Sequence, residues 1–194
     1  KTQILPAAAA RAAASAVRRA REEALAALGS YEPPPGRGRL LSGKNGAVLI
    51  DDSYNSSPAA AEEALQTLSH FPHAKRRIAV LGDMLELGRY SVREHERIGG
   101  LAASVVDELV TVGVRARGIA DGARSAGLAE DKITSFLDAR EAGEYLAPLA
   151  GAGDVILIKG SQTNIRLERT VEILLADPND RARLVRQERQ WLVR

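Results

Sequence analysis

The sequence predicts an α/β protein built on a mostly parallel sheet, with helices on both faces and one antiparallel edge strand. From residue 47 onward, a short apolar run is followed by a helix-forming segment five times, at intervals of roughly 25–30 residues. Connections of this length carry the chain back across a sheet, so successive strands run parallel. A further short apolar run, Leu40–Ser42, precedes the first repeat across Gly43–Gly46, which is the spacing of a hairpin.

The first 39 residues differ in composition from the rest. Pro6 is placed to open a helix over Ala7–Ala16, and a second helix is predicted over Arg18–Leu28 with Gly29 as its C-terminal cap. Such a pair is too small to bury a core of its own. Glu32–Arg39 then holds three prolines and two glycines. This composition favours a linker, but two arginines in a glycine-rich turn are also placed to reach an anion.

The remaining elements alternate between strands and helices. Apolar runs predict the strands, and capped runs of helix formers predict the helices. Ser91, with Glu94 three residues later, has capping-box spacing. The predicted strands are Ala47–Ile50, Lys75–Gly82, Glu108–Gly113, Lys132–Leu137 and Asp154–Gly160. The predicted helices are Pro58–Ser69, one from Ser91, Ala116–Ser125, Ala139–Leu149, one from near Asn164, and an amphipathic helix over Arg181–Leu192 after a break at Asp177–Asp180.

Composition limits the class of protein. The 194 residues suffice for one domain with room for an appendage, and 27 basic against 25 acidic residues leave a net charge of only +2. Without a dense basic block, and with 4% aromatics, nucleic-acid binding has little support. The absence of cysteine excludes disulfides and favours a reducing, cytoplasmic compartment. No apolar run approaches the ~18 residues of a membrane span. Because the chain begins with Lys rather than Met, we expect it to be part of a longer protein.

Two polar turns at strand ends are candidate ligand sites, since ligands bind at the carboxyl ends of parallel strands. Asp51 and Asp52 end the first strand, and neighbouring strand residues point to opposite faces, so they are not expected to form an acid pair. A carboxylate there binds ribose hydroxyls or a cation; alternatively, both are helix-cap and turn residues. Lys159–Ser161 offers an ammonium, backbone N–H groups and a hydroxyl to an anion at a predicted helix start.

Other common catalytic patterns are missing from the sequence. It contains neither the phosphate-binding loop Gly-x-x-x-x-Gly-Lys-Ser/Thr nor a Gly-x-Ser-x-Gly elbow. His70, His73 and His95 lack metal-ligand spacing, so no metal site is predicted in this chain. A single helix histidine such as His95 is expected to be structural.

Four segments, in this order, resemble the Mur ligase family. They are Pro34–Arg37, Asp51–Pro58, Ala79–Gly88 with His95 downstream, and Val155–Ser161. The resemblance spans about residues 1–176. Its most specific part is Gly-Asp-Met-Leu-Glu-Leu-Gly at 82–88, which is similar to the branch of the family that joins D-alanyl-D-alanine to a UDP-N-acetylmuramoyl-tripeptide.

The resemblance implies the domain organisation and the reaction. Residues 1–35 would be the end of a central ATP-binding domain with its hinge, and residues 36–194 a C-terminal Rossmann-like domain. The N-terminal domain, which holds the UDP-sugar, and most of the central domain, with its phosphate loop and magnesium ligands, would be further parts of the same protein. In the family, ATP phosphorylates the tripeptide carboxylate and the dipeptide amine then attacks the acyl phosphate. ATP and Mg²⁺ are therefore implied, and the chain alone is expected to be inactive.

The resemblance also assigns roles to individual residues. Arg37 is similar to the arginine that reaches the nucleotide phosphates from the hinge. Asp52 resembles the carboxylate that holds the ATP ribose, with Tyr54 and Asn55 beside it. Residues assigned to the dipeptide site are Lys159, Ser161 and, from the 82–88 signature, Asp83. Glu86 and His95 belong to the signature without an assigned role.

Two departures from the family pattern keep alternatives open. Where many members continue Lys-Gly-Ser with Arg-Gly-Met-Arg-Met-Glu, this chain has Gln162-Thr-Asn-Ile-Arg-Leu-Glu168. The acceptor could therefore be another amino acid. The segment 178–194 also extends beyond the usual end of the family, and its role is unassigned. A non-enzymatic nucleotide- or partner-binding module is the remaining alternative.

Overall fold

The computed structural model describes residues 10, 12–13, 21–162 and 165–192, and the chain divides into two units, Lys1–Pro33 and Pro34–Arg194. In the first unit, α2 (Arg21–Gly29) ends at the predicted glycine. The helix predicted over Ala7–Ala16 lies largely outside the described residues. The assignment of residues 1–35 and 36–194 to two parent domains remains a prediction.

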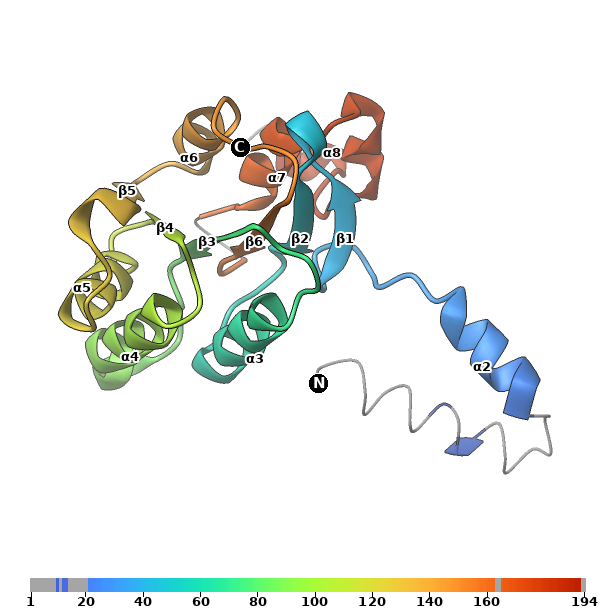
Figure 1. Ribbon diagram of the computed structural model, residues 1–194, viewed down its shortest axis with the longest axis horizontal. Coiled ribbons are helices and arrows are strands. Elements are labelled where there is room, and N and C mark those ends of the chain that lie inside the picture. Colours follow the sequence, from blue (N-terminus) through green and yellow to red (C-terminus); the bar gives the residue numbers. More distant parts are fainter. Residues whose placement is uncertain (1–9, 11, 14–20, 163–164, 193–194) are drawn as a thin grey trace. The chain divides into compact units, whose positions relative to one another are not determined.

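In the second unit, six strands form one sheet in the order β1-β2-β6-β3-β4-β5 (Figure 1). The edge strand β1 (Arg39–Ser42) pairs antiparallel with β2 (Val48–Asp52) across the predicted hairpin. The remaining pairs are parallel, and their strands are β3 (Arg76–Gly82), β4 (Glu108–Val112), β5 (Ile133–Phe136) and β6 (Asp154–Lys159). The predicted mostly parallel sheet with an antiparallel edge is confirmed.

Helices cover both faces of the sheet. They are α3 (Pro58–Ser69), α4 (Ser91–Ala103), α5 (Arg117–Ser125), α6 (Ala139–Leu146) and α7 (Glu168–Leu174). Figure 1 shows α3, α4 and α5 on one side of the sheet and α6 and α7 on the other. Within the described residues, no helix is both long and apolar enough to cross a membrane.

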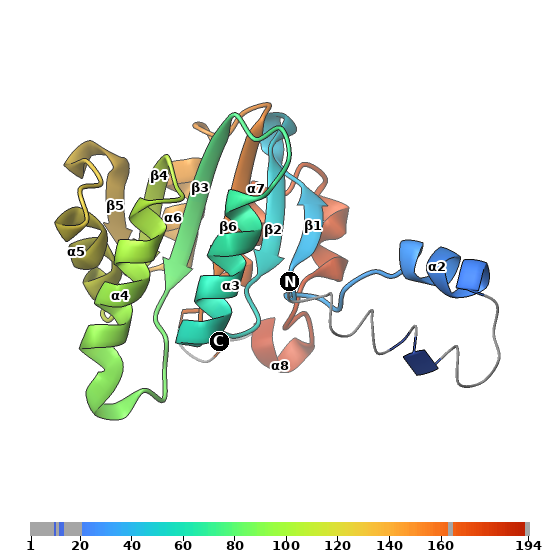
Figure 2. The ribbon, with the colours of Figure 1, turned by 60° about the horizontal axis from the view of Figure 1, so that its bottom comes forward.

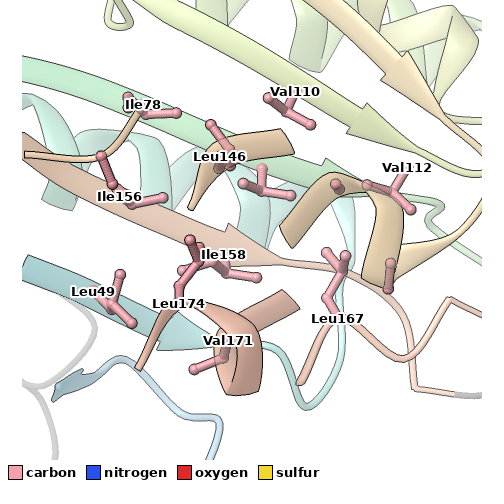
Figure 3. Packing of buried hydrophobic residues seen from close by; sticks show 14 of the residues in the cluster. Leu49, Ile78, Val110, Val112, Leu146, Ile156, Ile158, Leu167, Val171 and Leu174 are labelled. Atoms are coloured by element: carbon pink, nitrogen blue, oxygen red, sulfur yellow. The ribbon is translucent and has the colours of Figure 1, made fainter. Parts of the chain in front are cut away.

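One cluster of buried hydrophobic residues lies on each face of the sheet, which explains why the strands are apolar almost throughout. Neighbouring strand residues point to opposite faces, and both faces are covered. On β3, Ile78 belongs to the cluster under α6 and α7, and Ala79 to the cluster under α3, α4 and α5. Figure 3 shows the first cluster, in which Leu146 and Leu174 lie over strand residues such as Ile156.

The last strand of the chain, β6, lies between β2 and β3 rather than at an edge. Its register places Lys159 beside Asp52 of β2 and Leu81 of β3. A sheet whose strand order reverses in this way has a crevice outside the carboxyl ends of the strands at that point. The insertion therefore brings together two predicted sites that are far apart in the sequence.

The helix α4 begins at the predicted residue, but the predicted capping box is wrong. Tyr90 occupies the cap position with helical backbone angles, and its side chain makes no capping hydrogen bond. Glu94 instead accepts from Arg97 Nε at 2.9 Å, and Ser91 Oγ lies 3.5 Å from His95 Nδ1. Both side chains of the predicted box thus serve contacts along the helix.

The C-terminal tail, residues 177–192, does not form the predicted helix over Arg181–Leu192. It contains a 3₁₀ segment, Pro178–Arg183, then an irregular stretch over residues 184–188, then the short α8 (Arg189–Leu192). Arg186 has a left-handed backbone angle, φ 58°, which interrupts any helix through it. The helix predicted from near Asn164, a residue outside the described ones, begins at Glu168, after Arg166 with φ 54°.

Candidate functional site

An ion pair between Asp52 and Lys159 occupies the carboxyl end of the sheet. Lys159 Nζ donates to Asp52 Oδ2 at 2.6 Å and to the backbone oxygen of Asn55 at 3.0 Å. The Lys159 side chain is 2% exposed and that of Asp52 is 20% exposed. Burial raises the pKa of Asp52, and the positive charges of Lys159 and Arg37 act against that rise. Lys159 therefore anchors the turn, while part of the Asp52 carboxylate faces solvent and can accept a ligand hydroxyl.

Asp51 points away from this pair and holds the backbone together. Its Oδ2 accepts from the Gly36 amide at 3.1 Å, and its Oδ1 accepts from the Ser53 amide at 3.2 Å and the Ser53 hydroxyl at 2.6 Å. Burial raises the pKa of Asp51, and these hydrogen bonds oppose the rise. The two carboxylates have separate partners, as predicted. The alternative that one of them caps the following helix is wrong, because Ser57 caps α3.

The proline- and glycine-rich segment is, from Pro34 onward, part of the folded unit rather than a free linker. Tyr54 N–H donates to Gly36 O at 3.1 Å. Gly36 has φ +67°, and a Cβ there would lie 3.0 Å from Tyr54 N and 2.9 Å from Val185 Cγ1, so only glycine fits. The next residue, Arg37, places its guanidinium 4.1 Å from the centre of the Tyr54 ring.

A cleft of about 1000 Å³ opens beside Arg37 and Tyr54. Its other wall comes from the tail, including Arg186 and Trp191. The Arg37 guanidinium and the aromatic side chains Tyr54 and Trp191 in one cleft suit a planar, negatively charged ligand, whereas the Arg186 guanidinium is already bonded to Glu168 and to the Tyr54 carbonyl. The predicted nucleotide residues thus lie along the turn after β2 (Asp52, Tyr54 and Asn55) and in the segment packed against it (Arg37).

Ser161 lies close to this centre but lacks the predicted helix start. Its N–H donates to Asp83 O at 3.1 Å, and its hydroxyl, in a residue that is 1% exposed, has no hydrogen-bond partner. The described part of α7 begins only at Glu168, so no helix N-terminus follows Ser161 directly. Among the described residues, the buried Ser161 hydroxyl is a polar group whose hydrogen bond a ligand could supply.

Asp83 has a structural position. Its Oδ1 accepts from the Ala116 amide at 2.7 Å, and its Oδ2 lies 3.8 Å from Arg115 Nη1. Gly113 has φ +115°, and a Cβ there would lie 2.4 Å from Asp83 Oδ1. Asp83 therefore holds the loop between β4 and α5. The substrate role predicted for it remains a prediction.

His95 is a buried structural residue, as expected. Its Nδ1 donates to Ser91 O at 2.7 Å, and its Nε2 accepts from the Met84 amide at 2.9 Å, which defines a neutral ring protonated at Nδ1. Asp83 and His95, two residues of the signature, thus order the loop after β3. Glu86, the third, is exposed with φ 63°. In the part of the chain that the structure describes, no group of three His, Asp or Glu side chains could hold a metal ion.

Sequence reasoning missed a buried cluster of three charged residues that ties the tail to the sheet. Glu168 is 1% exposed; its Oε1 accepts from Arg166 Nε at 2.8 Å and its Oε2 from Arg186 Nη1 at 2.9 Å. The second Arg186 nitrogen, Nη2, donates to the Tyr54 carbonyl at 2.8 Å. The sequence spacing of these residues does not predict the cluster, because Glu168 and Arg186 are 18 residues apart.

Comparison with known proteins places these features in a family. The family model described as "Mur ligase, glutamate ligase domain" matches residues 36–162. Over 92% of this chain, the UDP-N-acetylmuramoyl-tripeptide--D-alanyl-D-alanine ligase of Bacillus subtilis is 29% identical. The enzyme of that name from Mycobacterium bovis is 34% identical over 80% of this chain. The chain spans 39% and 34% of these relatives' own lengths.

Solved structures agree with the sequence relatives. MurF ligase from Thermotoga maritima, crystallised in complex with ADP, matches 74% of this chain and 31% of its own at 31% identity, with a TM-score of 0.61. The UDP-N-acetylmuramoylalanyl-D-glutamyl-2,6-diaminopimelate--D-alanyl-D-alanyl ligase of Acinetobacter baumannii matches 93% of this chain and 37% of its own at 27% identity, with a TM-score of 0.69. On the family match over most of the second unit and on this similarity, the chain belongs to the Mur ligase family.

Proposed function

We propose that this chain is the C-terminal part of an ATP-dependent ligase that joins D-alanyl-D-alanine to a UDP-N-acetylmuramoyl-tripeptide in peptidoglycan precursor synthesis. The observation that carries the proposal is the similarity to a ligase of this name over 92% of the chain. The geometry supports it, because the partly exposed Asp52 carboxylate lies within the influence of the Arg37 charge, and the Arg37 guanidinium lies 4.1 Å from the centre of the Tyr54 ring. Peptidoglycan precursors are assembled in the cytoplasm, and we propose that location for the protein.

In this proposal the chain supplies one side of a composite site. Arg37 faces the nucleotide phosphates from the hinge, and Asp52 accepts hydrogen bonds from the ribose hydroxyls, with Tyr54 and Asn55 beside it. The residues proposed for the dipeptide side are Lys159, Ser161 and Asp83. Residues 1–35 are the end of the central domain, whose remaining part supplies the phosphate loop and the Mg²⁺ ligands.

The reaction proceeds in two steps. The tripeptide carboxylate attacks the γ-phosphorus of ATP, so that ADP leaves and an acyl phosphate forms. The amine of D-alanyl-D-alanine then attacks the acyl carbon, phosphate leaves, and the amine loses its proton as the peptide bond forms. Mg²⁺, held by residues of the central domain, would neutralise phosphate charge. The residues of this chain orient the nucleotide and exclude water. The phosphoryl transfer itself takes place where the central domain holds the phosphates.

A coupled assay on the full-length protein tests the proposal. ADP release is measured with UDP-N-acetylmuramoyl-tripeptide and either D-alanyl-D-alanine or single amino acids, and the product mass is determined. We expect release that depends on the dipeptide, and a product heavier by that dipeptide. Release only with a single amino acid would contradict the proposed acceptor. The chain of 194 residues alone should hydrolyse no ATP, since its sequence has no phosphate loop.

A Mur-like ligase that adds another amino acid is the second candidate. The departure Gln162–Glu168 from the family pattern favours it, because this segment begins next to the buried, unpaired hydroxyl of Ser161. The same assay, run with a panel of amino acids, separates the two candidates.

A further inference from the structure

The C-terminal tail, which the proposed function leaves unused, packs against the turn that contains Asp52. Leu184, Val185 and Arg186 are buried, at 3%, 8% and 7% exposure. Figure 2 shows α8, the end of the tail, near the carboxyl end of β2. A Cβ at Gly36 would approach Val185 Cγ1 to 2.9 Å, so the tail also contacts the hinge at van der Waals range. The tail is thus part of the folded unit.

Arg186 is the residue through which the tail reaches the site. Its guanidinium carries out two tasks at once: Nη1 bonds Glu168 at 2.9 Å and Nη2 donates to Tyr54 O at 2.8 Å. The Arg186 side chain is 5% exposed. Two acceptors in different directions require the planar fork of an arginine, which a lysine ammonium on a single stem does not reproduce.

The other members of the cluster hold Arg186 in place. Arg166 bonds the second oxygen of Glu168, and its Nη1 donates to Trp191 O at 2.7 Å. The tail is therefore attached at two points, once through Arg186, which bonds Glu168, and once through the carbonyl of Trp191, which accepts from Arg166. Because Arg166 also bonds Glu168, at the start of α7, the tail and α7 position the Arg186 guanidinium together.

The Tyr54 peptide lies between two supports. Its N–H donates to Gly36 O at 3.1 Å, and its C=O accepts from Arg186. Asp52, two residues before Tyr54, and Asn55, directly after it, supply the two oxygens that bind Lys159. Loss of the Arg186 contact would leave the Tyr54 carbonyl without its charged donor and free the turn on one side.

We propose that Arg186 is a positioning residue for the nucleotide side of the site: through the Tyr54 carbonyl it holds the 52–55 turn in the conformation in which Asp52 and Asn55 bind Lys159. This inference rests on the proposed function for its ligand, ATP, and on the contacts above for its geometry. The tail is then a functional extension of the family domain. It forms the second wall of the cleft beside Arg37 and Tyr54.

The test uses Arg186→Met and Arg186→Lys in the full-length protein, with Arg189→Met as the matched control on an exposed residue of α8. The first measurement is amide hydrogen exchange of residues 53–55. We expect faster exchange in Arg186→Met, a smaller effect in Arg186→Lys, and none in the control. Unchanged exchange in Arg186→Met would overturn the proposal, whatever substrate the enzyme uses.

The second measurement separates positioning from general damage. We expect the KM for ATP to rise by roughly tenfold in Arg186→Met, as for loss of a charged hydrogen bond, while kcat and the KM for the amine substrate change less than about threefold. An equal change in all three constants would indicate only a damaged fold and would overturn the proposal. If Arg186→Met does not fold, the same comparison is decided by Arg186→Lys.

These outcomes are distinguishable from a failure of the proposed function. If the wild-type protein uses ATP with a different amine, the proposed acceptor is wrong, and the KM comparison is made with that amine. If the wild-type protein binds no ATP, both the ligase proposal and the nucleotide role of Arg186 are wrong.

Discussion

Replacing Glu168 by Gln perturbs the one residue on which the buried charges of the tail converge. The carboxylate is 1% exposed and binds two guanidinium groups, one at 2.8 Å and one at 2.9 Å. Glutamine keeps the size and shape of the side chain. It removes the negative charge, however, and turns one acceptor oxygen into an N–H donor that faces a guanidinium.

The burial of both arginines sets the size of the expected effect. Their side chains are 9% and 5% exposed, so water cannot replace the lost carboxylate. Removing one partner from a buried ion pair costs about 3–5 kcal/mol, because an uncompensated charge remains inside. In a chain of this size each kcal/mol lowers Tm by about 2–4 °C, so we expect Glu168→Gln to lower Tm by roughly 10 °C.

Urea unfolding of the purified chain, followed by far-ultraviolet circular dichroism, measures the free energy of unfolding. Trp191, the single tryptophan, reports separately on the tail through its fluorescence. The matched control is Glu172→Gln on the same helix. Glu172 pairs with Arg181 at 3.1 Å, with side chains 26% and 46% exposed, so its loss should cost less than about 1 kcal/mol. A Glu168→Gln variant as stable as this control would refute the reasoning.

Two further predictions concern the rest of the fold. Gly99→Ala places a Cβ 1.9 Å from the backbone oxygen of Ile119, where α4 crosses α5. We expect the free energy of unfolding, measured in urea, to fall by about 1–3 kcal/mol or more. Gly100→Ala has nothing within 4 Å of its Cβ and should be neutral or stabilising; similar losses in both variants would contradict the packing argument. Burial opposes ionisation of Asp154, but hydrogen bonds from Arg76 and Gly151 outweigh it and hold its pKa below the ordinary 3.8. The ionised Asp154 therefore contributes its full stabilisation above pH 3.8, and this contribution is lost as pH falls through the lowered pKa. We expect the Tm difference between wild type and Asp154→Asn to shrink below pH 3.8. A difference that stays constant would show that the Asp154 charge does not contribute to stability.

The fold was largely predictable because local patterns decide its elements. Apolar runs mark strands that are buried on both faces, and the five strand–helix repeats predict parallel pairing whatever the strand order. The helix Pro58–Ser69 has the predicted bounds, since Ser57 caps it and Pro58 fits its first turn. The capping box at Ser91 failed because Tyr90 is already helical, so Ser91 lies inside the helix.

The sequence identifies candidate site residues one by one but not how they are arranged in space. Asp52 and Lys159 each follow from a strand-end turn in the sequence. Their 2.6 Å contact depends on β6 lying between β2 and β3, which no local pattern encodes. The family resemblance predicts that Asp52 contacts the nucleotide and Lys159 the dipeptide, and the structure adds that their side chains form an ion pair.

By itself, the sequence determined the α/β class, the order of strands and helices along the chain, and the polar turns at the strand ends, because these depend on neighbouring residues and on periodicity. Only the tertiary structure decided the strand order, the packing of Gly36 and Arg37 against Tyr54, and the path of the tail. Leu184, Val185 and Trp191 fit a helical pattern, yet Arg186 takes a left-handed angle and residues 184–188 around it form no helix. Contacts with Glu168 and with the Tyr54 carbonyl, 132 residues away, outweigh local helix propensity there, and such contacts exist only once the sheet has formed.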